Sequence, residues 1–132
     1  MQTRVFEIGE KRYDVAMASA VKQDELLSIL SRHMVIASSV AKQQGTELNE
    51  NSVLIAVMAF PVDIKKKIVD IVTEMAIEVG TTNRVSVKDF AGKMVEWNLF
   101  IARLIMWNLA DFFELLSGGE LEKMLMGELK NK

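Results

Sequence analysis

Few side chains in this sequence could hold a metal ion or act as an acid or a base. His33 is the single histidine, and the chain contains no cysteine. A metal site on a helix usually pairs a histidine with a second ligand one turn away, and no second histidine lies at that spacing. The nearest carboxylates, Asp24 and Glu25, are not spaced as a ligand set. We therefore expect no metal site.

Motifs for catalysis or phosphate binding are equally weak. Asp111 and Glu114 lie three residues apart near a predicted helix end, a spacing more typical of surface charges than of a buried acid–base pair. Residues 117–120, SGGE, follow a predicted helix, where the negative end of the helix dipole would repel a phosphate. No G-x-S-x-G motif is present. We expect no catalytic residue, no cofactor and no enzyme.

Composition narrows the class of partner. The 132 residues are 50% hydrophobic and 26% charged, which suits one globular domain with a real core. A net charge of −2 and a pI near 5.5 argue against a nucleic-acid partner, because phosphate contacts need clustered Lys and Arg. The longest apolar run, residues 53–62, is shorter than the ~20 residues of a membrane span. We expect a soluble protein of the cytoplasm.

Alternating apolar residues predict a β-hairpin in residues 1–18. The apolar residues that share a face of each strand are Phe6, Ile8, Tyr13, Val15 and Met17. Gly9 and Glu10 between the strands predict a two-residue turn, in which Gly supplies the positive φ. An isolated hairpin is only marginally stable, so its apolar face must pack on another part of the protein.

Residues 19–119 are predicted to form the helical core. A first helix is expected between Ser19, as its N-cap, and Gly45, as its stop. A second helix is expected to begin at Asn49 or Asn51. Pro61 divides it from the next helix, either as a kink or as the first turn of a new helix.

The pattern after Pro61 predicts two more helices and a tail. One helix is expected to continue to Gly80. Ser86 and Asp89 have the spacing of a capping box, which predicts a further helix that continues to Ser117. Residues 120–132 predict a short amphipathic piece. The expected fold is a single domain that is mainly α, a small bundle of four to five helices with an N-terminal β-hairpin.

Residues 96–119, EWNLFIARLIMWNLADFFELLSGG, are apolar nearly all round when they are projected on a helix. At about 100° per residue, Glu96, Phe100, Arg103, Trp107 and Glu114 fall on one line, with Asp111 close by. The charged residues mark this line as the solvent face, yet two large rings lie on it. The remaining arc is apolar and includes Trp97, Ile101, Leu104, Ile105, Leu109, Phe112 and Leu116.

Two explanations for this helix remain open. It is either central in the bundle or buried in an oligomer or partner interface, where aromatic residues are favoured. Because a domain of this length cannot easily surround such a helix, we expect another copy or a client to cover Phe100 and Trp107. The residues expected at this self-association or partner surface are Phe100, Arg103, Trp107, Asp111, Trp97, Phe112 and Phe113, with Met106, Met124 and Met126 as further contacts.

The order of these segments resembles the tail assembly chaperones of long-tailed, siphovirus-type phages and prophages. The resemblance rests on VFEIGEKRYDV near the start, DELLSIL at residues 24–30 and WNLADFF at residues 107–113. It covers most of the chain as a pattern of hydrophobic segments, and the family offers no catalytic motif.

The resemblance implies a chaperone that binds and solubilises the tape-measure protein and assists polymerisation of the tail tube in the host cytoplasm. Such a chaperone is absent from the finished virion. Its implied partners are the tape-measure protein, the tail-tube protein, a frameshift-extended form of the chain and further copies of itself. The alternatives are a structural tail or head-to-tail connector subunit, which would stay in the virion, and a small helical regulatory protein.

Overall fold

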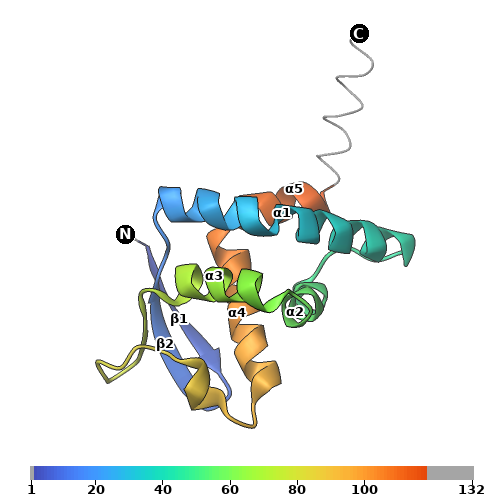
Figure 1. Ribbon diagram of the computed structural model, residues 1–132. Coiled ribbons are helices and arrows are strands. Elements are labelled where there is room, and N and C mark those ends of the chain that lie inside the picture. The colour runs from blue at the N-terminus through green and yellow to red at the C-terminus, as the bar shows by residue number, and fades with distance from the viewer. Residues whose placement is uncertain (1, 119–132) are drawn as a thin grey trace.

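The computed structural model describes residues 2–118, which form five α-helices, one 3-10 helix and a three-stranded sheet (Figure 1). The elements are, in chain order, β1 (Thr3–Ile8), β2 (Lys11–Ala16), α1 (Ala20–Gln43), α2 (Glu50–Met58), α3 (Val62–Thr73), β3 (Ala76–Glu78), η1 (Val87–Phe90), α4 (Met94–Asn108) and α5 (Ala110–Ser117). A mainly helical fold with an N-terminal hairpin is therefore confirmed. The predicted tail, with Met124 and Met126, lies outside the described residues. None of the helices within residues 2–118 is long and apolar enough to cross a bilayer.

The hairpin forms as its sequence predicts. β1 pairs antiparallel with β2 from Thr3 opposite Ala16 to Ile8 opposite Lys11, which leaves Gly9 and Glu10 as the turn. Gly9 has a φ of 60°, the conformation that a glycine adopts most easily.

The prediction of a helix up to Gly80 is wrong. α3 ends at Thr73, and Ala76–Glu78 form the strand β3 instead. β3 pairs antiparallel with the side of β2 that faces away from β1, with Asp14 opposite Ile77. The pairing satisfies backbone groups that a strand edge would otherwise leave open, so a tertiary contact decides the structure of this segment.

The start and stop signals of the first two helices act as predicted. The Ser19 hydroxyl accepts a hydrogen bond from the Lys22 backbone N–H at 3.4 Å, and Gly45 follows α1 with a φ of 76°. Asn49 caps α2 by accepting a hydrogen bond from the Ser52 backbone N–H at 3.0 Å.

The last predicted helix is broken in two places. Ser86 and Asp89 form the expected capping box, but the turn that they open is the short 3-10 helix η1. α4 begins only at Met94 and ends at Asn108. The buried Asn108 side chain accepts a hydrogen bond from the Ala18 backbone N–H at 2.9 Å, which ties the end of α4 to the segment between β2 and α1.

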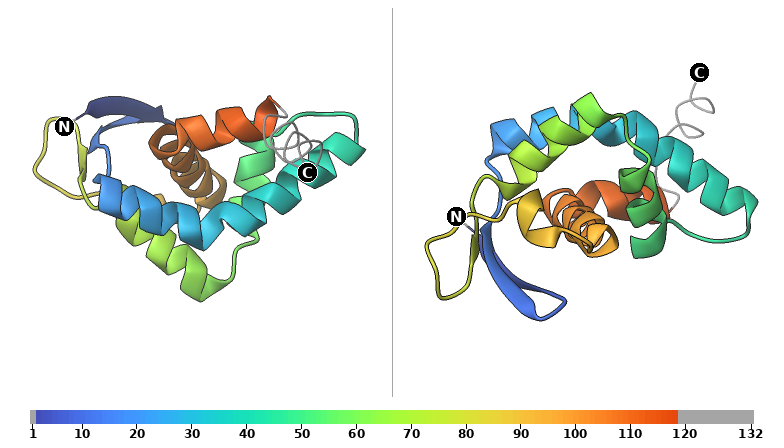
Figure 2. Two further views of the ribbon diagram at one scale, coloured as in Figure 1. Left: turned by 90° about the horizontal axis from the view of Figure 1, so that it is seen from above. Right: turned by 60° about the horizontal axis from the view of Figure 1, so that its bottom comes forward.

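α4 is the central element of the fold (Figure 1, Figure 2). It contacts α2, α3, α5, η1 and β1, while α1 packs on α2, α3 and α5. In the described residues one cluster of buried side chains joins the hairpin to the helices; α4 contributes Trp97, Phe100, Ile101, Ala102, Leu104 and Ile105. Two explanations were left open for the aromatic helix. In the structure, α4 is buried at the centre of its own chain.

A groove between the hairpin and the aromatic helix

The face of α4 that the sequence assigned to solvent is the face on which the hairpin packs. At the N-terminal end of α4, the Glu96 carboxylate lies against the hairpin turn. A Cβ added to Gly9 would be 3.1 Å from both oxygens of that carboxylate. One turn further along, Phe100 stacks on Tyr13 with ring centroids 5.0 Å apart.

Towards the C-terminal end of α4, the same face contacts β1. Arg103 Nη1 donates a hydrogen bond to the Glu7 backbone carbonyl at 3.3 Å. Trp107 meets Phe6 edge-on, with ring centroids 5.4 Å apart. Glu96 and Arg103 are therefore contacts to the hairpin turn and backbone, and this part of the line is not a solvent face. Asp111 and Glu114 at its far end are exposed.

The expectation that another copy or a client covers Phe100 is wrong for this residue. Phe100 is 0% exposed and has Tyr13, Phe6 and Trp97 around it at centroid distances of 5.0, 6.1 and 6.5 Å. An isolated hairpin must bury its apolar face, and an apolar helix must be covered. Packing of the hairpin on α4 does both. Trp97 is buried in the same aromatic cluster.

The remaining candidate residues on α5 do not share one surface. Phe113 is buried, Phe112 is partly buried against it at a centroid distance of 5.6 Å, and Asp111 is exposed. The Asp111 carboxylate accepts a hydrogen bond from the Phe112 backbone N–H at 2.8 Å. The Asp111 side chain therefore has a hydrogen bond within its own chain and needs no partner protein to satisfy it.

Arg103 and Trp107 do come together, at an open groove between β1 and the end of α4. We call this the Trp107 groove, and it has a volume of about 620 Å³. Its lining residues are Arg4, Val5, Phe6, Glu7, Glu50, Arg103, Met106, Trp107 and Ala110. Seven residues were predicted at a partner surface, and two of them, Arg103 and Trp107, line this groove. Met106, predicted as a further contact, lines it as well.

Charges of both signs surround the apolar part of this groove. The Arg103 guanidinium binds Glu50 on α2 in a bidentate manner, at 3.2 Å through Nε and 3.1 Å through Nη2. The Arg4 guanidinium carbon lies 5.1 Å from the centroid of the Phe6 ring, as a cation–π contact. The Arg103–Glu50 pair is half-exposed, so it orients Arg103 more than it stabilises the fold.

Tyr13 on β2 carries a buried hydroxyl that has no hydrogen-bond partner among the described residues. Burial raises the pKa of Tyr13, and the negative charges of Glu78, Asp89 and Glu96 raise it further. The neutral phenol is therefore the form that the fold accommodates.

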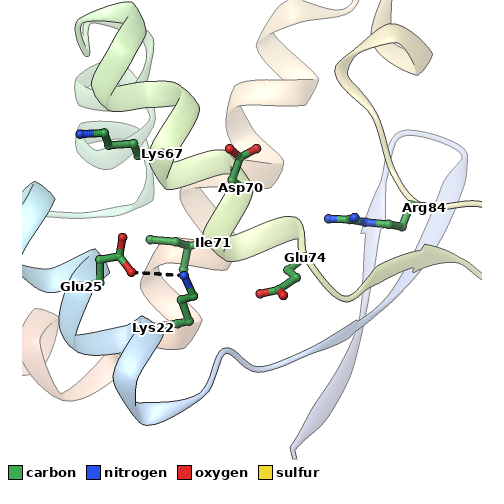
Figure 3. Close-up of a pocket in the computed structure, with 7 residues that line it drawn as sticks. All are labelled: Lys22, Glu25, Lys67, Asp70, Ile71, Glu74 and Arg84. Carbon is green, nitrogen blue, oxygen red and sulfur yellow. Dashed lines mark hydrogen bonds and ion pairs between the residues drawn. The ribbon is translucent and has the colours of Figure 1, made fainter.

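A second, highly charged hollow lies between α1 and α3 (Figure 3). Its charged side chains are Lys22, Glu25, Lys67, Asp70, Glu74 and Arg84. Both signs are equally represented, and Lys22 pairs with Glu25 at 3.3 Å. Of the described residues predicted at a partner surface, none lines this hollow, and the mixture of charges gives no preference for one class of ligand.

Sequence reasoning missed two parts of the surface. It missed the contribution of β1 and α2 to the Trp107 groove, because only the tertiary fold brings Arg4, Glu7 and Glu50 to α4. It also missed a smaller hollow of about 340 Å³ between α1 and α2, where Val40 and Ile55 are 47% and 62% exposed. The sequence contained a signal for this smaller hollow, because Val40 is an apolar residue that lies off the buried stripe of α1.

Comparison of the chain with protein-family models, with curated proteins and with solved structures gives no match.

Proposed function

We propose that this protein is a tail assembly chaperone, which binds and solubilises a tape-measure protein and assists polymerisation of the tail tube around it. It acts as a homo-oligomer in the host cytoplasm and is absent from the finished virion. The resemblance in the sequence supplies the client and the process, and the Trp107 groove supplies the surface.

The observation that carries the proposal is the composition of the groove. Trp, Met and Arg are enriched in protein interfaces, and Trp and Arg are also enriched in the small set of residues that dominate binding energy. Trp107, Met106 and Arg103 meet in this one place. Ala110 beside them is small and exposed, so it leaves room for a side chain of the client. The described residues that line the hollow between α1 and α2 include no aromatic residue and no arginine.

The charged rim and the apolar floor together fit one face of an amphipathic helix. Such a helix presents apolar side chains at spacings of three and four residues, with charged side chains at either flank. Arg4 and Glu7 lie on the β1 side of the groove, and Glu50 and Arg103 lie opposite. A long helical tape-measure protein offers many such faces in succession, so an oligomer can hold it at several points.

The test is co-expression with the tape-measure protein of the same phage genome, scored by the soluble fraction of that protein. Ala110→Asp adds a charge to the groove wall without removing a buried contact. Val95→Asp is the matched control, because Val95 is 61% exposed on α4 and lies outside the groove.

We expect the wild-type chain and the Val95→Asp variant to raise the soluble fraction of the client. We expect Ala110→Asp to reduce this gain severalfold while its thermal unfolding stays near that of the control. Equal solubilisation by both variants would place the client elsewhere and overturn the role of the groove. No solubilisation by the wild-type chain would overturn the proposed function.

A further inference from the structure

The β-sheet has one covered edge and one open edge. On the β3 side, the segment that follows the strand returns along it: Ile77 bridges Arg84, and the Val85 backbone N–H donates to the Ala76 carbonyl at 2.9 Å. On the other side, β1 is the last strand of the sheet. Within residues 2–118, no strand or loop pairs with the outer side of β1.

The register of the hairpin defines which groups of β1 point outward. The Met17 backbone N–H donates to the Gln2 carbonyl at 2.8 Å, and the two-residue turn makes Ile8 and Lys11 the closing pair. Backbone bonding alternates along an antiparallel strand, so the even residues bond to β2. The N–H and C=O groups of Thr3, Val5 and Glu7 therefore face away from the sheet.

Among residues 2–118, no group bonds to the centre of this edge. Val5 is 43% exposed, and its outward N–H and C=O take no part in the hairpin. At one end, Arg103 already bonds to the Glu7 carbonyl. Natural proteins usually protect such an edge, so an edge left open over several residues is a site for strand addition.

We propose that β1 of a second copy of this chain pairs antiparallel with β1, about a two-fold axis at Val5. In this register, Val5 lies opposite Val5, and Thr3 of one copy lies opposite Glu7 of the other. All three outward-facing residues of one copy then lie opposite outward-facing residues of its mate. Each of these three pairs forms two backbone hydrogen bonds, about six in all. The Glu7 carbonyl accepts its bond through a second lone pair, beside the bond from Arg103. The inference rests on the self-association that the proposed function includes, and it does not depend on the identity of the client.

The side chains of β1 favour a second copy over an extended segment of the client. The same register sets Arg4 of one copy opposite Phe6 of the other, and Arg4 already contacts the ring of Phe6 within its own strand at 5.1 Å. No like charges lie directly opposite each other. The proposed client is helical, so it cannot supply the backbone groups that an open strand edge requires.

Pairing of this kind has a consequence for the Trp107 groove. A two-fold axis perpendicular to the sheet sets both helical layers on the same side of a six-stranded sheet. The grooves of the two copies then border the same pair of central strands and form one longer surface. A doubled groove binds a long helix at two points, which raises its effective affinity without a new contact.

Val5→Pro tests the pairing selectively. Proline removes the outward N–H and places a ring on the open edge, while the hydrogen bonds between β1 and β2 stay intact. Val5→Thr is the matched control, because it keeps the N–H and the β-branched shape. Both variants carry any affinity tag at the C-terminus, because β1 begins at Thr3. The measurement is sedimentation velocity over a wide range of protein concentration, without client.

We expect the wild-type chain and Val5→Thr to associate with the same dissociation constant, and Val5→Pro to raise it at least tenfold. Circular dichroism at the same concentrations shows whether Val5→Pro keeps the folded monomer. Equal association of Val5→Pro and the wild type would overturn the proposal, as would a wild-type chain that stays monomeric.

Hydrogen exchange supplies a test without a substitution. The amides of Thr3 and Val5 have no hydrogen-bond partner within residues 2–118, so they should exchange rapidly in dilute wild-type protein and slowly in concentrated protein. Protection that is independent of concentration, or that appears only when the tape-measure protein is added, would contradict pairing with a second copy. Because client solubility is not scored, this result stands apart from the outcome for the proposed function.

Discussion

Replacement of Phe100 by alanine should destabilise the monomer strongly, because the ring is covered by its own chain. Phe100 is 0% exposed and stacks on Tyr13 at 5.0 Å. Loss of a fully buried Phe side chain costs about 3–5 kcal/mol, out of the about 5–15 kcal/mol that stabilises a typical domain. At roughly 3–5 °C per kcal/mol for a domain of this size, the melting temperature should fall by about 9–25 °C.

Thermal unfolding by circular dichroism, repeated at several protein concentrations, measures this loss. Val95→Ala on the same helix is the control, since Val95 is 61% exposed and its loss should change stability by less than about 0.5 kcal/mol. A Phe100→Ala variant that melts within 2–3 °C of the wild type, roughly the effect of a surface substitution, would refute the packing of the hairpin on α4. Reduced self-association of the same variant would then identify Phe100 as an interface residue.

Two further substitutions test the hairpin itself. Tyr13→Phe should leave stability at neutral pH unchanged or raise it by up to about 1 kcal/mol, because it removes a buried hydroxyl that lacks a partner. In the folded state the pKa of Tyr13 is raised above its ordinary value of 10.0, so the stability of the wild type should fall as the pH rises above that value. Urea denaturation from pH 7 to about 11 measures this fall, which should be smaller for Tyr13→Phe. Gly9→Ala should cost about 1–2 kcal/mol in thermal unfolding, because the φ of 60° and the Glu96 carboxylate both oppose a Cβ. Adding Glu96→Ala to that variant should recover only the part due to the carboxylate, and full recovery would contradict the role of the backbone conformation.

The elements that sequence reasoning predicted well are those defined by local turn and capping chemistry. The turn at Gly9, the caps at Ser19 and Asn49 and the capping box at Ser86 each depend on residues within a few positions of one another. Such interactions are present in the sequence pattern itself, so the hairpin and the helix starts could be predicted from it.

The strand β3 shows where this local reasoning fails. Met75 and Val79 continue the helical periodicity of α3, yet they are 51% and 43% exposed. The segment between them is a strand because the outer side of β2 offers it hydrogen bonds. A periodic pattern cannot show that a distant strand needs a partner.

The candidate site could be predicted only in part, for the same reason. Helical projection correctly aligned Phe100, Arg103 and Trp107 on one face of α4, but a projection does not show what packs on that face. The hairpin covers Phe100 completely and Trp107 only partly. The groove at Trp107 is the part of the face that the hairpin leaves open, and its other wall comes from residues that are distant in sequence.

The proposed function implies that a phage genome encodes this chain. Mass spectrometry of that phage tests the central proposal most directly, because it separates an assembly chaperone from a structural tail subunit. Lysates of infected cells and purified virions are compared, and the tape-measure protein is captured from each. The proposed function predicts that the chain co-purifies with the tape-measure protein from the lysate and is missing from the virion. Its presence in purified virions in amounts comparable to other tail proteins would contradict the chaperone and favour a structural subunit.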